Sequence, residues 1–184
     1  MLHSGFTPEI SMDIMGAIWS KFVLNCGINP VCAISGLRAG EVARNVSADE
    51  MQTQILEEVM SVVEAKGINL DNDDMVGYVK KLTRMSYNKP SMQQHMEAGR
   101  PTEIDSLNGA LVREAKKLGI SVPFNEALVF MVKARETAMT ETAKGVEKDY
   151  AKLEAEAEAE EGPVKPVSYT HLRAHETPEP RVGR

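Results

Sequence analysis

The sequence predicts an all-α protein, and three observations carry that prediction. Apolar residues recur at steps of three and four along much of the chain, the spacing that gives a helix one buried face. Alternating apolar and polar runs, which indicate half-buried strands, are nearly absent. The 184 residues are 42% hydrophobic and 26% charged, an ordinary composition for one globular domain with a sizeable core.

The first half of the chain divides into three predicted helices. One runs from about residue 11 to residue 28 and closes near Pro30, because proline interrupts a helix. The next opens at Ser47 with Ser-Ala-Asp-Glu, a capping-box pattern, and stops near Gly67. A third begins in the acidic run 71–74 and continues with apolar residues at helical spacing.

The second half predicts three more helices. A short one begins at Ser91, where Ser-Met-Gln-Gln again has the form of a capping box. The next spans 102–118 and ends at Gly119, a residue suited to a left-handed cap. The last begins near Asn125 and continues, increasingly polar, towards residue 160.

The end of the chain differs in composition. Residues 153–162, LEAEAEAEEG, favour a helix but offer no apolar face, so we expect an exposed extension. Residues 163–184 contain four prolines and no periodicity, and SYTHLRAHET resembles translated sequencing-adapter read-through. We therefore expect 163–184 to be a disordered, non-native tail and exclude it from the fold.

Composition also excludes several classes of protein. The net charge is −6 with no basic block, so nucleic acid and anionic membrane are poor partners. We expect no apolar run to approach the roughly 20 residues of a membrane span, and the N-terminus lacks the pattern of a signal peptide. Cys26 and Cys32 have no zinc-type companions, so we expect free thiols in a reducing compartment and no metal site. A cytoplasmic location, or the interior of an organelle, fits this best.

A polar stripe inside the first predicted helix is the first candidate site. Lys21, Asn25 and Asn29 recur at steps of four in an otherwise apolar segment, which places them on one slowly drifting face. A surface stripe is the simpler interpretation, but asparagine is a mediocre helix former. We therefore expect a polar wall beside a partly buried cleft, with the lysine partly desolvated and the carboxamides bonding a carboxylate or hydroxyl.

A second candidate stretch is NKPSMQQHMEAGRPTEIDSLNG, residues 88–109. Ser91 and Thr102 could act as helix caps and Glu103 as a partner of the helix dipole. That interpretation explains each residue separately, but it does not explain why this stretch and the stripe occur together.

Both stretches together resemble ketopantoate reductase (2-dehydropantoate 2-reductase). The motifs are W-x-K-x-x-x-N-x-x-x-N-P and S-M-x-x-x-x-x-x-G-R-x-T-E-I-D-x-x-N-G, joined by GISVPFNEAL at 119–128. The likeness runs from about residue 10 to residue 136. It covers that family's C-terminal helical domain, a multi-helix substrate and dimerisation domain of the 6-phosphogluconate dehydrogenase C-terminal-like type.

The resemblance implies a role for each candidate residue. Lys21 would be the general acid that protonates the ketone oxygen as hydride arrives. Asn25, Asn29 and Ser91 would bind substrate, with Asn88 as a further candidate. Glu103 would reach the NADPH side of the cleft.

The chain departs from the family pattern at three points. His95 stands where the family usually has an aspartate, and Ala39 stands where an asparagine often precedes Gly-Glu. A G-x-G-x-x-G turn after a strand, which would bind NADPH, is missing. We therefore expect a fragment without the N-terminal Rossmann domain, inactive alone, with NADPH bound mainly by the missing domain.

The expected organisation and function follow from the resemblance. Residues 1–10 would be the remnant of an interdomain segment, 11–150 the reductase domain and 151–162 the extension. The leading hypothesis is the catalytic half of an NADPH-dependent reductase that makes pantoate from ketopantoate in pantothenate and coenzyme A biosynthesis. Two alternatives remain: a reductase of another 2-oxo acid, or a non-catalytic helical module for dimerisation or protein binding. A homodimer through the helical domain is open in each case.

Overall fold

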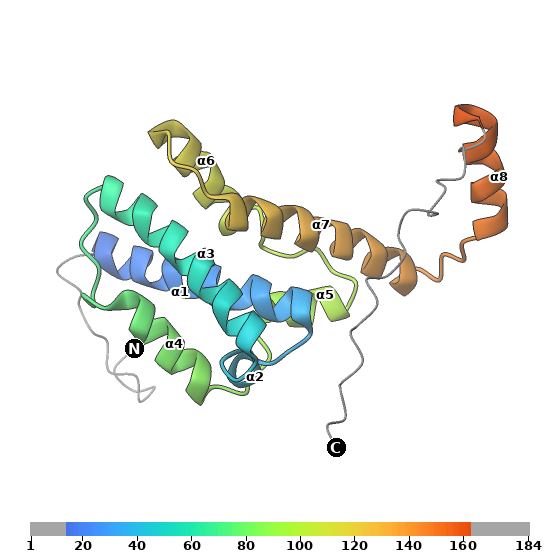
Figure 1. Cartoon of the computed structure of the whole chain (residues 1–184). Helices are drawn as coiled ribbons and strands as arrows, with labels where there is room; N and C mark the ends of the chain where they lie inside the picture. The colour runs from blue at the N-terminus through green and yellow to red at the C-terminus, as the bar shows by residue number, and fades with distance from the viewer. Residues whose placement is uncertain (1–13, 163–184) are drawn as a thin grey trace, which may run out of the picture. The chain divides into compact units, whose positions relative to one another are not determined.

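The structure is a computed structural model that describes residues 14–162, and these residues form helices and no strand, which confirms the all-α prediction (Figure 1). The expectations for 1–10 and 163–184 lie outside the described residues. The helices are α1 Ile14–Ser35, α2 Ala39–Val42, α3 Val46–Ala65, α4 Met75–Met85, α5 Ser91–Glu97, α6 Asn108–Leu118, α7 Pro123–Ala143 and α8 Tyr150–Glu161.

The described residues fall into two compact units, one that ends at Val146 and one that begins at Glu147. The first unit is built around α1, which packs against α2, α3, α4, α5 and α7. Helix α1 runs alongside α3, with α4 beside them (Figure 1). Fully buried side chains of α1 and α3, among them Val23, Cys26, Leu56 and Val59, form the centre of the core.

The predicted end of the first helix at Pro30 is wrong, because α1 continues to Ser35 with the proline inside it. Proline has no N–H to bond the carbonyl four residues earlier, which here is that of Cys26. The side chain of Asn108 donates a hydrogen bond to that carbonyl at 3.2 Å. The side chain of Gln52 likewise bonds the carbonyl of Gly27 at 3.0 Å. Tertiary contacts thus allow the helix to continue.

Helix α1 is also long and apolar enough, by length and composition alone, to cross a membrane. The expectation that no apolar run approaches that length is therefore wrong. Half of its most apolar window is buried inside the protein, so packing as the central helix of the first unit accounts for its composition.

The starts of α3 and α5 differ from the predicted caps. Asn45, not Ser47, caps α3 by accepting from the N–H of Ala48 at 3.1 Å. Ser91 is the first residue of α5 and follows Pro90 at the cap position, where no side chain caps the helix. Both predicted capping boxes are wrong, although the helices that they mark are present.

The ends of α4 and α6 follow the sequence more closely. Asp74 caps α4 by accepting from the N–H of Gly77 at 2.9 Å, within the predicted acidic run. Gly119 has φ 71° and ends α6 in the left-handed region, as predicted. Helix α6 begins at Asn108, later than predicted, because the residues from Glu103 onward form turns.

The long final helix of the prediction is two helices. Helix α7 ends at Ala143, and Gly145 has φ 67°, a conformation that ends a helix readily only at glycine. Helix α8 belongs to the second unit and has no buried residue. The short helix α2 was not predicted at all.

Candidate functional site

The predicted stripe descends from the surface into the protein. Lys21 is exposed, Asn25 is half-buried and Asn29 is only 7% exposed. The expectation that Lys21 is partly desolvated is therefore wrong for the first unit. The carboxamide end of the stripe is enclosed, and Asn29 precedes Pro30 directly.

The side-chain amide of Asn29 has no hydrogen-bond partner among residues 14–162, and the same holds for Asn25. Neither carboxamide is among the fully buried polar groups without a partner, so solvent still reaches both of them. Asn29 therefore carries donor and acceptor capacity that a bound polar ligand could use.

A cavity of about 390 Å³ lies beside Lys21. It is lined by residues of α1, of the loop before α4 and of α4 itself: Ala17, Ser20, Lys21, Leu24, Asp71, Asn72, Met75 and Tyr78. The loop is fastened to α1 where the N–H of Asp71 donates to Oγ of Ser20 at 3.0 Å. The lysine thus lines a hollow together with a phenol, a carboxamide and a carboxylate.

A second cavity of about 290 Å³ shares Leu24 with the first. Its lining is mostly apolar and includes one predicted site residue, Asn88; the full set is Leu24, Ile28, Ala39, Leu82, Ser86, Asn88 and Pro90. The structure therefore places Lys21 and Asn88 at two hollows that share one wall of α1.

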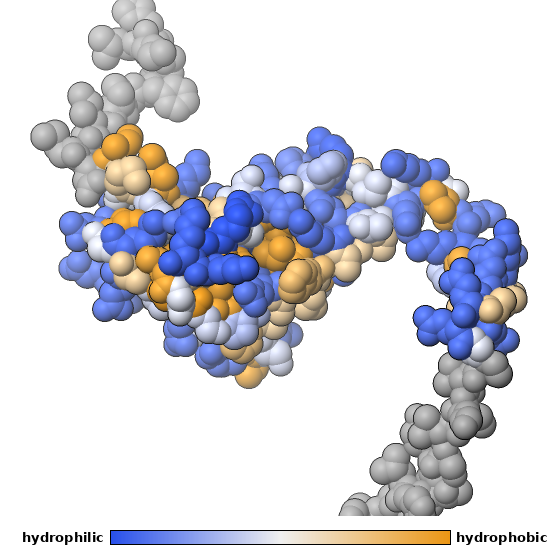
Figure 2. All heavy atoms as spheres, turned by 90° about the horizontal axis from the view of Figure 1, so that it is seen from above, coloured by the Kyte–Doolittle hydropathy of each residue, from blue (hydrophilic) through white to orange (hydrophobic). Residues whose placement is uncertain are grey.

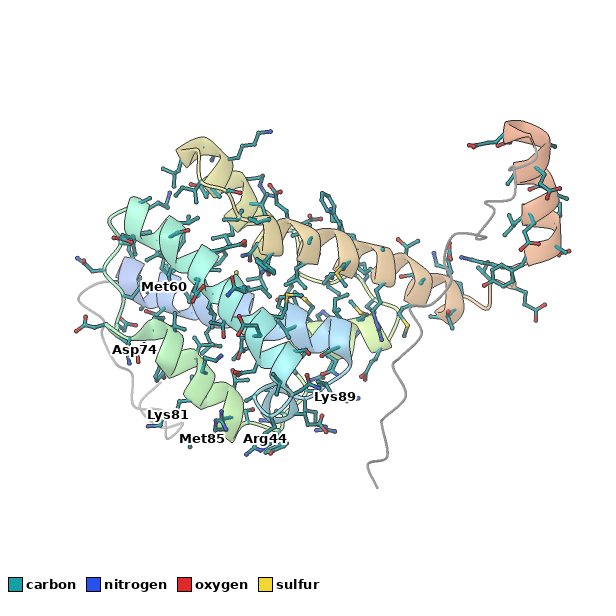
Figure 3. All side chains as sticks on the ribbon, viewed as in Figure 1. Arg44, Met60, Asp74, Lys81, Met85 and Lys89 are labelled. Atoms are coloured by element: carbon teal, nitrogen blue, oxygen red, sulfur yellow. The ribbon has the colours of Figure 1, made fainter. Side chains whose placement is uncertain are left out.

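The segment that carries Asn88 is held by α2 and its flanks. The N–H of Gly40 donates to the carbonyl of Ser86 at 2.6 Å, and Arg38 donates to the carbonyl of Tyr87 at 2.8 Å. The Arg44 guanidinium lies 5.3 Å from the centre of the Tyr87 ring. Figure 3 shows Arg44 close to the C-terminal end of α4.

Ser91 and Glu103 are exposed and line neither cavity. Glu103 lies in the turns before α6, which are fastened to α7. There Glu136 accepts a hydrogen bond from the N–H of Thr102, and Lys133 pairs with Asp105 at 2.8 Å. The structure thus fixes the position of Glu103 but shows no contact between Glu103 and the stripe.

Three buried amides behind α1 were missed as functional residues: Gln52, Asn108 and Asn125. Asn108 donates to Oδ1 of Asn125 at 2.9 Å as well as to Cys26. Asn108 and Asn125 both lie in the motifs quoted above, so the sequence marked these two residues, but no role was assigned to them. The contribution of Tyr78 and Asn72 to the Lys21 cavity had no signal in the sequence, because it depends on how α4 packs.

Electrostatics and metal-binding capacity limit the chemistry of the site. Burial raises the pKa of Cys26, and burial together with Glu41 raises the pKa of Cys32 to about 12. Both are free cysteines, and at neutral pH they remain protonated, poor nucleophiles. Within residues 14–162 no group of three His, Cys, Asp or Glu side chains could hold a metal ion.

The fold defines the class: an all-helical domain assembled around one long, proline-containing helix. The family model described as "Ketopantoate reductase PanE/ApbA C terminal" matches residues 13–136. The chain therefore belongs to this family, which confirms the resemblance predicted from the motifs.

Curated relatives agree with the family. The 2-dehydropantoate 2-reductase of Archaeoglobus fulgidus is 33% identical over 136 residues, which cover 74% of this chain and 46% of the relative. That of Shigella flexneri is 35% identical over 142 residues, covering 76% and 46%. The chain thus spans about half the length of the curated relatives it matches.

Solved structures show the same fold. A PanE/ApbA family ketopantoate reductase from Ralstonia eutropha JMP134 matches with a TM-score of 0.69 and 32% identity, over 73% of this chain and 45% of the other. D-mandelate dehydrogenase, solved with NADH and anilino(oxo)acetate, matches with a TM-score of 0.68 and 28% identity, over 74% and 45%.

Proposed function

We propose that this chain supplies the substrate-binding and catalytic half of an NADPH-dependent reductase that converts 2-dehydropantoate to pantoate. Membership of the family supports the reaction class. The observation that carries the proposal for this chain is Asn29, a residue only 7% exposed whose carboxamide has no hydrogen-bond partner within residues 14–162 and which lies two helical turns from an exposed lysine. The pathway would be pantothenate and hence coenzyme A biosynthesis, in the cytoplasm.

In this proposal the stripe binds and protonates the substrate. Asn25 and Asn29 bond the carboxylate and hydroxyl of the 2-oxo acid, with Asn88 and Ser91 as further binding residues. NADPH supplies hydride to the ketone carbon, and the Lys21 ammonium gives its proton to the oxygen that becomes the alcohol. The positive charge also stabilises the developing alkoxide before the proton moves.

The described residues suit only the edge of a cofactor site. They contain no strand, so no strand–turn–helix unit holds a pyrophosphate within 14–162. Glu103 can accept hydrogen bonds from ribose hydroxyls or the nicotinamide amide, and its exposure leaves it accessible to a second domain. NADPH would thus be bound mainly by an N-terminal domain, and the 184-residue chain alone should show negligible turnover.

The direct test is calorimetric titration of the 184-residue chain with 2-dehydropantoate. Asn29→Leu should weaken binding about tenfold or more, since a hydrogen bond to a charged group is worth about 1.5–3 kcal/mol. Asn69→Leu, in the exposed loop before α4, is the matched control and should bind as the parent does. Equal affinity of the two variants would contradict the proposal.

Another 2-oxo acid remains an alternative substrate, and a specific observation favours keeping it. Ala39, which departs from the family pattern, lines the cavity that contains Asn88. The D-mandelate dehydrogenase structure shows that a fold this similar occurs in a protein named for a different substrate. Parallel titrations with 2-dehydropantoate and an aromatic 2-oxo acid would decide between the two.

A homodimer through the helical domain is also proposed. A ketopantoate reductase of Staphylococcus aureus is described as dimeric, but at 21% identity that likeness shows the fold alone. Figure 2 shows apolar surface interrupting a largely hydrophilic face of the chain. Light scattering of the purified chain would give its oligomeric state, and a monomeric mass at high concentration would contradict the proposal.

A further inference from the structure

We propose that Asn108 is a positioning residue that replaces the hydrogen bond lost at Pro30, that Gln52 supports it by a further bond to the next carbonyl, and that together they set the spacing of Lys21, Asn25 and Asn29. The inference rests on the proposed function for its meaning, since it concerns the same stripe.

The proline adjoins the last residue of the stripe. Pro30 follows Asn29, and its missing N–H leaves the Cys26 carbonyl, directly after Asn25, without its helical partner. The weakened part of the helix therefore lies between the two carboxamides. Helices with an internal proline bend where the ladder is broken, so the separation of Asn25 and Asn29 depends on what holds that carbonyl.

Two side-chain amides bond the carbonyls of α1 just before Pro30. Asn108 and Gln52 are each 0% exposed. The Asn108 amide nitrogen donates to the Cys26 carbonyl at 3.2 Å, and that of Gln52 donates to the Gly27 carbonyl at 3.0 Å. Because carbonyl oxygens only accept, these contacts fix which end of each amide faces α1.

Both amides act chiefly as hydrogen-bond donors. The remaining hydrogen of Asn108 goes to Oδ1 of Asn125 at 2.9 Å, and that of Gln52 goes to Oγ1 of Thr83 at 3.0 Å. Their own side-chain oxygens are buried and have no partner in the described part of the chain. A buried amide whose oxygen is left without a partner is costly, which indicates that its position is set by the donors.

The amides are themselves anchored. Asn125 donates to the Ile55 carbonyl at 3.2 Å and to Glu58 at 2.7 Å. Thr83 donates to the Val79 carbonyl at 2.8 Å. The break in α1 is thus fastened from one side to α3, α6 and α7 and from the other to α3 and α4.

The test is a double-mutant cycle in the 184-residue chain. Asn108→Leu should raise the unfolding equilibrium constant about 10- to 100-fold, because the Cys26 carbonyl loses its donor. In Pro30→Ala the restored backbone N–H can bond that carbonyl, so the same substitution should cost about tenfold less. Asn108→Ala, a smaller change at the same carbonyl, provides a second cycle with Pro30→Ala if Asn108→Leu alone fails to fold. If Asn108→Leu destabilises the parent chain and the Pro30→Ala variant equally, the Asn108 side chain does not replace the missing N–H of Pro30.

Positioning is separated from general stability by a matched control. Leu111→Ala truncates a buried side chain on the same helix as Asn108 and destabilises the core without touching α1's carbonyls. The NMR signals of the Asn25 and Asn29 side-chain amides should move in Asn108→Leu and stay in place in Leu111→Ala. Equal movement in both variants would reduce Asn108 to a structural residue.

Substrate binding distinguishes this inference from the proposed function. Folded Asn108→Leu should bind 2-dehydropantoate about tenfold more weakly than folded Leu111→Ala. If the parent chain does not bind that acid but the cycle and the NMR shifts behave as expected, the proposed function fails and the positioning of the stripe stands.

Discussion

The side-chain amide of Asn125 donates a hydrogen bond to the carboxylate of Glu58 at 2.7 Å. The same carboxylate accepts from the backbone N–H groups of Phe124 and Asn125, each at 2.9 Å. Helix α7 begins with Pro123 after Val122, and Val122 has no side-chain cap. A glutamate of α3 thus caps α7 across 66 residues of sequence.

Loss of this cap should destabilise the chain. Glu58→Ala removes three hydrogen bonds to a carboxylate near the positive end of the helix dipole, so we expect a loss of about 1–3 kcal/mol in the free energy of unfolding. Glu57→Ala, at the exposed neighbouring position, should change it by less than about 0.5 kcal/mol. Urea unfolding of the two variants measures the difference, and equal stabilities would refute the cap.

The elements that could be predicted from the sequence are those that local chemistry determines. Apolar spacing predicts α3, α4 and α6, and glycine predicts the left-handed end at Gly119. The end of α1 could not be predicted, because the donor that replaces the missing N–H at Pro30 lies 82 residues from its acceptor. The cap of α7 could not be predicted for the same reason, because Glu58 lies 66 residues from Phe124, from whose N–H it accepts a hydrogen bond.

The candidate site divides in the same way. The step of four predicts that Lys21, Asn25 and Asn29 share a face, since that follows from helix geometry alone. Their exposure could not be predicted, because it depends on where α4 and its loop leave hollows beside α1. Glu103 was expected in the first turn of a helix and lies in turns before it.

The two buried thiols should make stability fall at alkaline pH. Burial raises the pKa of Cys32 from 9.0 to about 12, so above pH 9 the unfolded chain releases a proton that the folded chain keeps. Stability is then fully present below pH 9 and is lost as pH rises towards 12, by at most about 1.4 kcal/mol per pH unit for one thiol.

Comparison of urea unfolding at pH 8 and pH 10 measures this loss. Cys32→Ala should reduce the loss relative to the parent chain, because one of the two thiols no longer titrates. Glu41→Gln removes the second cause of the raised pKa and should have a smaller effect in the same direction. If Cys32→Ala loses as much unfolding free energy between pH 8 and pH 10 as the parent chain does, groups other than Cys32 cause the loss.

Gly40 should be required for the packing of the Tyr87 ring, in the residue before Asn88. A Cβ at Gly40 would lie 2.7 Å from the Tyr87 ring, and the N–H of Gly40 bonds the carbonyl of Ser86. Gly40→Ala therefore has to displace the ring, at a cost of about 1–3 kcal/mol. Tyr87→Ala should remove most of that cost, so the double variant should be more stable than the sum of the two effects. Strict additivity in thermal unfolding would contradict the contact.

Substitution of Lys21 distinguishes a catalytic domain from a helical binding module. In a fusion with the nucleotide-binding half of a relative, Lys21→Ala should lower kcat about 100-fold or more, because the alkoxide loses both its counter-charge and its proton donor. KM should change little, since in the proposed function Asn25 and Asn29 bind the substrate. Lys21→Arg should recover only part of the rate, because arginine keeps the charge but hardly releases a proton.

The matched control is Lys81→Ala, at an exposed position on α4 (Figure 3). Steady-state rates of 2-dehydropantoate reduction by the two alanine variants make the comparison, and Lys81→Ala should retain the parent rate. A rate for Lys21→Ala within about threefold of the parent would make the lysine an ordinary surface residue. The stripe would then serve binding alone, and the non-catalytic module would become the better interpretation of this chain.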